Sequence, residues 1–176
     1  MTPGVKVEVA LDDAAARAVM DRLAGLDGDQ TQLMRKIGDQ VKLRVDERFE
    51  GGFGPGRVPW KRSRRAAEQS GQTLVDSGRL AQSITRNPGP RSVEVGTNVA
   101  YAAIPQFGGT NRAKTPTGLI FRVGGQAGRS KGSWRRVMQV VIPARPFLGI
   151  DQDDIADIDA VVTDHLAKLS QAGGEA

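Results

Sequence analysis

Two long stretches of this chain repeat their apolar residues at the spacing of an α-helix, and they lie far apart in the sequence. Residues 31–49 place on one face Leu33, Met34, Ile37, Val41, Val45 and Phe49. Residues 151–170 do the same with Ile155, Ile158, Val162, Leu166 and Leu169, and begin in aspartates that suit the positive end of a helix. Because an apolar stripe has to be buried against another element, both stretches predict helices of a folded core.

The residues between these two helices form short segments that glycine and proline interrupt. Strands are expected at residues 4–11, 93–95, 119–123 and 134–142, and further helices at residues 12–26 and 77–84. The sequence therefore predicts a single α+β domain, residues 1–176, in which a small antiparallel β-sheet packs against N-terminal helices and a C-terminal helix. Long glycine-rich basic loops, expected to be flexible, fall at about residues 51–72 and 109–133.

Composition removes several classes of function. The chain has no cysteine, so disulfides, thiolate nucleophiles and cysteine-ligated zinc are excluded. No apolar run approaches the roughly 20 residues of a membrane span. The N-terminal stretch lacks the apolar core of a secretory signal, so we expect neither membrane contact nor export through such a signal.

The net charge of +5 is unevenly distributed along the chain. No acidic residue lies between Glu94 and Asp151, whereas seven of the last 26 residues are acidic. The basic residues expected to face a partner are Arg112, Lys114, Arg122, Arg129, Lys131, Arg135 and Arg136. Such a surface can bind nucleic acid or the acidic part of an identical neighbour. We favour the neighbour, because Trp134 alone accompanies the cations and base stacking is poorly supported.

No catalytic constellation is evident. His165 is the single histidine and lies at the edge of an apolar helix face, which favours a packing or surface role over catalysis. The acidic run at residues 151–159 lacks the glycine and distal glutamate of a calcium loop, so its aspartates are interpreted as helix caps. The two glycine-rich loops lack the glycine-lysine-serine ending that places a lysine on the phosphates of a phosphate-binding loop. We therefore expect no enzyme activity, no cofactor and no metal.

Three motifs occur in order, downstream of Trp60 and its glycine-rich loop: LVDSGRLAQSI at 74–84, VEVGTNVAYAAIPQFGG at 93–109 and IPARPFLGI at 142–150. Together they resemble the phage virion morphogenesis family, the tail completion or neck proteins of Mu-like tailed phages. The resemblance implies a structural virion protein at the head–tail junction that assembles in the host cytoplasm. Its implied partners are copies of itself, in a ring, and other neck and tail proteins, with non-specific contact to DNA in transit also possible. The alternatives are a tail terminator ring that caps the tail tube and a small basic nucleic-acid-binding protein.

These motifs supply the candidate interface or motif residues: Trp60, Ser77, Gly78, Arg79, Leu80, Tyr101, Gln106, Phe107, Gly108, Arg145, Pro146 and Phe147. Tyr101 and Phe107 are expected to pack in the core, with a subunit interface as the alternative. Arg145 lies between two prolines that stiffen the backbone. It is expected either to meet a partner's carboxylate or ring, or to form an internal salt bridge with Asp151 or Asp153.

Overall fold

The computed structural model describes residues 18, 21, 28–123 and 133–172. Its helices are α2 (Thr31–Gly51), α3 (Arg64–Glu68), α4 (Arg79–Gln82), α5 (Ala103–Phe107) and α6 (Gln152–Ala172), with 3-10 turns η1 (Pro55–Arg57) and η2 (Ala100–Ala102). Its strands are β1 (Ile84–Pro88), β2 (Val93–Thr97), β3 (Gly109–Arg112), β4 (Leu119–Val123), β5 (Ser133–Val137) and β6 (Gln139–Ile142). The α+β class is confirmed, as are the two long helices.

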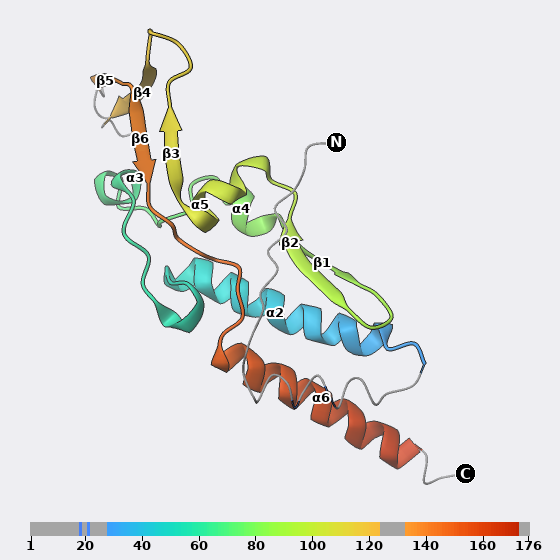
Figure 1. The fold of residues 1–176 in the computed structure, drawn as a ribbon. Coiled ribbons are helices and arrows are strands. Elements are labelled where there is room, and N and C mark those ends of the chain that lie inside the picture. Colours follow the sequence, from blue (N-terminus) through green and yellow to red (C-terminus); the bar gives the residue numbers. More distant parts are fainter. Residues whose placement is uncertain (1–17, 19–20, 22–27, 124–132, 173–176) are drawn as a thin grey trace.

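Helix α2 is the middle layer of the body. The β1–β2 hairpin lies along one side of it and α6 along the other (Figure 1). Its N-terminal half packs Leu33 and Ile37 against Val162 of α6. Its C-terminal half enters a second cluster that gathers side chains from many segments: Val45, Phe49, Trp60, Leu80, Ile84, Val99, Ala102, Phe147 and Leu148.

The expectation of one small sheet is wrong in detail. The described strands form three separate antiparallel pairs, β1–β2, β3–β6 and β4–β5. The expected strand at 134–142 is interrupted at Met138, opposite which residues 113–118 are inserted between β3 and β4. Alternating apolar residues predict a strand but not such an interruption, because the interruption depends on the partner strand.

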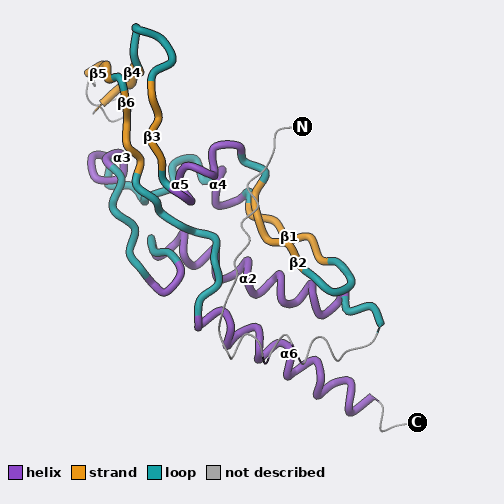
Figure 2. Tube along the Cα trace, in the orientation of Figure 1, coloured by secondary structure: helices purple, strands orange, loops and turns teal. Residues whose placement is uncertain are grey.

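The β3–β6 pair continues into the β4–β5 pair, and the two pairs together, residues 109–123 and 133–142, form a projection that we call the arm. The arm projects away from the helical body (Figures 1 and 2). Side chains of β3 are all exposed, as are those of the first four residues of β5. The ribbon is therefore held by its own strand pairing and by its attachment at the body.

The segments expected to be loops contain regular structure. Residues 51–72 include η1 and α3, and they bury Trp60 and Ala66. Residues 109–112 form a strand, β3, instead of a loop, because pairing with β6 satisfies their backbone, and the expected strand at 119–123 is confirmed as β4. The expected strand at 4–11, residues 124–132 and all but two residues of the expected helix at 12–26 lie outside the described residues.

Candidate functional site

A single extended segment, residues 143–150, connects the arm to helix α6, and we call it the strap. It starts at Pro143, directly after β6, and crosses the body before α6 begins at Gln152 (Figure 2). Pro143 and Pro146 have no amide hydrogen and fix their own φ angles, so the strand cannot continue through them. The strap therefore depends on side chains of the body to satisfy its remaining backbone groups.

Gln106, in α5, provides more of these bonds than any other described side chain. Its Oε1 accepts hydrogen bonds from the amides of Phe147 and Leu148, each at 3.0 Å. Its Nε2 donates to the Leu148 carbonyl at 2.7 Å. The buried amide thus pairs with the strap as the backbone of a neighbouring strand would. These bonds join the second motif to the third.

Aromatic packing fixes the strap from the other side. The Trp60 indole donates to the Pro146 carbonyl at 2.9 Å. Phe49 packs against both Trp60 and Phe147, with ring centroids 5.6 Å and 5.2 Å apart. Gly54 permits the close approach, since a Cβ there would lie 2.6 Å from the Pro146 carbonyl oxygen. Trp60, Pro146 and Phe147 were singled out by their motifs, and the structure brings them together.

The internal salt bridge expected for Arg145 is not formed within the described residues. Its side chain is buried, its Nε donates to the Lys61 carbonyl at 2.7 Å, and its amide donates to the Pro105 carbonyl. No described carboxylate lies within ion-pair distance of it, so the expected bridge to Asp151 or Asp153 is wrong. Burial lowers the pKa of the Arg145 guanidinium from its ordinary value. Arg145 fastens the strap to the segment that carries Trp60.

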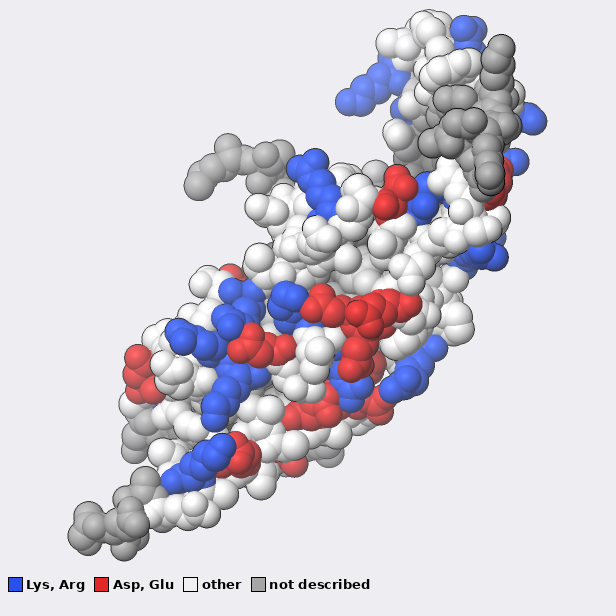
Figure 3. Space-filling model, turned by 180° about the vertical axis from the view of Figure 1, so that it is seen from behind, with Lys and Arg blue, Asp and Glu red and all other residues white. Residues whose placement is uncertain are grey.

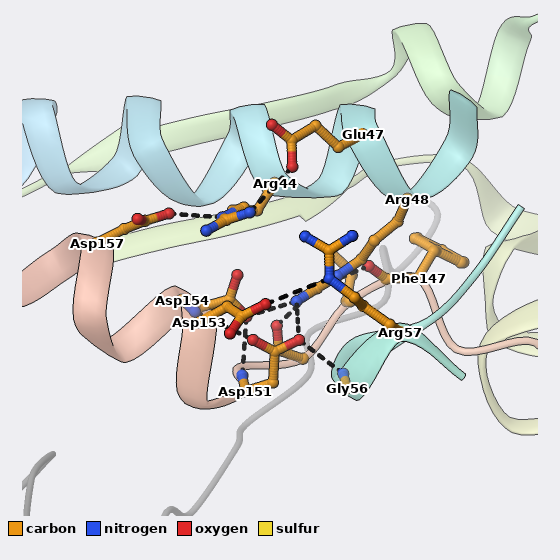
Figure 4. A network of polar contacts seen from close by, with 12 residues as sticks. Arg44, Glu47, Arg48, Gly56, Arg57, Phe147, Asp151, Asp153, Asp154 and Asp157 are labelled. Carbon is orange, nitrogen blue, oxygen red and sulfur yellow. Dashed lines mark hydrogen bonds and ion pairs between the residues drawn. The ribbon is translucent and has the colours of Figure 1, made fainter. Parts of the chain in front are cut away.

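Arg48 forms the bridge that was expected of Arg145. Figure 4 shows it reaching from α2 to the start of α6. Its Nη1 donates to the carbonyls of Phe147 and Gly149, and its Nη2 to the carboxylates of Asp151 and Asp154, at 3.1 and 2.5 Å. Sequence reasoning missed this residue. The sequence feature that could have indicated it is a charged residue on the apolar face of the predicted helix, three positions after Val45.

Asp151 and Asp154 also cap α6 reciprocally, each carboxylate accepting the other residue's amide. Burial would raise the pKa of Asp151, but amide hydrogen bonds from Gly56 and Asp154 and the charge of Arg48 hold it below its ordinary value. Burial raises the pKa of Asp154, one of whose oxygens has no hydrogen-bond partner. The cap interpretation of these aspartates is confirmed, and it also ties α6 to α2.

Internal contacts use most of the acidic cluster that was expected to face a neighbour. Asp154 is buried, and Asp157 binds Arg44 and Gln40 of α2 at 2.5 and 2.9 Å. Asp153 keeps an exposed side chain and a long contact of 3.4 Å with Arg57. The start of α6 is thus a poor docking surface, and exposed carboxylates have to be sought elsewhere.

The arm carries the predicted basic residues. Arg112, Lys114, Arg135 and Arg136 are exposed, Arg122 lies in β4, and Arg129 and Lys131 fall outside the described residues. Large apolar side chains accompany them: Ile120 (52% exposed), Met138 (57%), Val141 (69%) and Trp134 (72%). Exposed apolar groups of this size on a projecting element indicate a surface made for contact.

The remaining motif residues divide between core and surface. Leu80 is buried, and Gly78 has the positive φ that starts α4, where Arg79 is exposed and the Ser77 hydroxyl accepts from the Arg79 amide. The expectation that Tyr101 and Phe107 lie in the core is wrong, because both are exposed while Ala102 and Gln106 turn inward. Gly108 has φ +71° and starts the arm.

Within the described part of the chain, no group of acidic or histidine side chains is placed to hold a metal ion. Nor is any described helix long and apolar enough to cross a membrane.

Comparison with known proteins extends the motif resemblance to most of the chain. A model described as the phage virion morphogenesis family matches residues 11–167, which include α2, the arm, the strap and most of α6. "Mu-like prophage FluMu G protein 2" of Haemophilus influenzae is 33% identical over 164 residues, covering 93% of this chain and 98% of that protein. No solved structure matches the chain significantly.

Proposed function

Because the chain belongs to the phage virion morphogenesis family, we propose that it is a non-enzymatic virion protein that forms a homo-oligomeric ring at the head–tail joint. In this role it completes the tail or joins it to the capsid. The similarity to a Mu-like prophage protein over nearly the full length of both chains supports a phage role.

The observation that carries the proposal is the exposed arm. An isolated two-stranded ribbon is marginally stable in water, and a side chain such as Trp134, 72% exposed, gains from being covered. The strap holds the base of this ribbon with several buried hydrogen bonds. A rigid base and an uncovered apolar tip suit an element that reaches onto another subunit.

A ring needs two different surfaces on one subunit, so that each copy binds the next head to tail. Residues 109–142, the stretch of sequence that contains the arm, include no acidic residue, whereas carboxylates are spread over the helical body. Opposite charges on separate surfaces favour such a contact and disfavour the pairing of two arms.

The test is a phage in which this gene is deleted. We expect filled heads and complete tails that remain separate in electron micrographs, with joined particles restored by the wild-type gene supplied in trans. Tails of uncontrolled length would instead indicate a tail terminator. Normal infectious particles from the deletion phage would contradict the proposal.

A further inference from the structure

We propose that the arm of one subunit docks on the outer face of helix α2 of the next copy, with Trp134 and Ile120 against Leu43. This contact rests on the proposed ring and specifies which two surfaces form it.

The docking face of the arm follows from strand register. Ile120 of β4 lies opposite Arg136 of β5, and paired residues point to the same side of a ribbon. Trp134 is two residues from Arg136 in the same strand and therefore shares that side. All three side chains are exposed. This face thus presents two large apolar groups beside a guanidinium.

The receiving face is the solvent side of α2. Among the large apolar side chains of this helix, Leu43 alone is exposed, at 51%. Helical spacing places Asp39, Asp46 and Glu50 around it, at four residues before and three and seven residues after. Glu47 lies one turn from Leu43 on the same side, and its side chain is 45% exposed. The surface is an apolar spot surrounded by carboxylates, the complement of the arm.

Local ion pairs leave part of this acidic surface available. Lys42 binds Asp46 at 2.6 Å, Arg44 binds Glu47 at 3.2 Å and Arg86 forms an ion pair with Asp39, so none of these three carboxylates is free of a cation. Glu50 is exposed and pairs with no described cation. Lys36 lies toward the N-terminal end of the receiving face of α2, so the acidic character of this face belongs to the C-terminal half of the helix. Arg136 is therefore expected to contact the C-terminal end of the receiving face of α2, where Glu50 lies.

A second copy fits the arm better than nucleic acid does. DNA offers phosphates to the arginines but little apolar surface for Ile120, Met138 and Val141, whose aliphatic chains have no aromatic ring to stack on bases. The face of α2 satisfies both the apolar and the basic requirement. Figure 3 shows cations on the projecting part, whereas the carboxylates of the body lie among cations of the body. A head-to-tail contact therefore depends on the carboxylates that local ion pairs leave available.

Disulfide trapping tests the contact directly, since the natural chain has no cysteine. The double variant Leu43→Cys, Trp134→Cys should form a ladder of covalent oligomers on mild oxidation of the assembled protein. The matched control, Leu169→Cys with Trp134→Cys, places the second cysteine on an equally exposed leucine of α6 and should form no ladder above background. Equal trapping in both variants, or trapping only in the control, would overturn the proposal.

A charge exchange provides the independent measurement. Arg136→Glu alone and Glu50→Arg alone should each weaken self-association about tenfold or more in mass photometry, and the double variant should recover most of it. Arg91→Glu, an equal charge change on an exposed residue outside both surfaces, should leave association unchanged.

Three outcomes would contradict the contact. These are no recovery in the double variant, a wild-type chain that stays monomeric at every concentration, and a loss of duplex-DNA binding with intact assembly in Arg136→Glu. None of them alters the deletion phenotype, so failure of this contact and failure of the proposed virion role can be distinguished.

Discussion

Single side chains fix the strap where regular secondary structure is absent. Gln106 replaces a neighbouring strand, Trp60 holds one carbonyl, and Arg48 holds two carbonyls and two carboxylates. The motifs made it possible to predict that Gln106 and Trp60 matter. Their bonds could not be predicted, because each partner lies 40 or more residues away in the sequence.

Replacing Gln106 with alanine should destabilise the protein by about 3 kcal/mol. The substitution leaves two buried amides and one carbonyl of the strap without partners, and each such group costs about 1–3 kcal/mol unless water reaches it. Urea unfolding measures the change. Gln82→Ala, at an exposed position of α4, is the control and should change stability by less than about 0.5 kcal/mol.

Asp151 should make stability dependent on pH in the acid range. Its pKa is lowered in the folded protein, so its contribution is full above the ordinary aspartate value of about 3.9 and is lost as the pH falls below it. The difference in unfolding free energy between wild type and Asp151→Asn should therefore be largest near neutrality. It should shrink between about pH 4 and pH 2.

Asp154 should change stability with pH in the opposite direction to Asp151. Its pKa is raised by burial, so protonation of Asp154 favours the folded state. The unfolding free energy of the wild type should therefore rise relative to that of Asp154→Asn as the pH falls toward 4. If the two differences in unfolding free energy, wild type against Asp151→Asn and wild type against Asp154→Asn, changed with pH in the same direction, the two carboxylates would not have the separate environments described above.

At the scale of elements, the long helices and the strand segments at 119–123 and 134–142 were predictable, whereas strand β3 was not. Helix α6 and the body of α2 follow from apolar periodicity, which depends only on neighbouring residues. Strand β3 has no apolar alternation, and all four of its residues are exposed. It exists because β6 pairs with it, which is a property of the fold and not of the segment.

The junction between α5 and the arm requires glycine at position 108. Its φ is +71°, and a Cβ would lie 2.8 Å from the Ala144 amide nitrogen, a backbone atom that cannot move aside. Gly108→Ala should cost about 2 kcal/mol or more, measured by urea unfolding. Gly109→Ala is the matched control, since nothing lies within 4 Å of its added Cβ. Equal stability of the two variants would refute the close approach.

At the scale of the whole molecule, the uneven distribution of charge was evident from the sequence. Which carboxylates make internal contacts and which face solvent was not. The aspartates at the start of α6 were expected to attract a neighbour, whereas Asp154 and Asp157 hold α6 on α2. Sequence alone does not separate a carboxylate that faces solvent from one that faces a buried arginine. The structure moves the candidate acidic surface to the outer face of α2, around Leu43.

The central claim, a ring of this protein at the head–tail joint, is tested most directly by an electron cryomicroscopy map of the virion neck. The account predicts a closed ring of identical subunits between capsid and tail, in which each copy contributes an arm to its neighbour and shows α2 and α6 side by side. A map that places the chain elsewhere in the particle, or virions that lack it altogether, would contradict the claim.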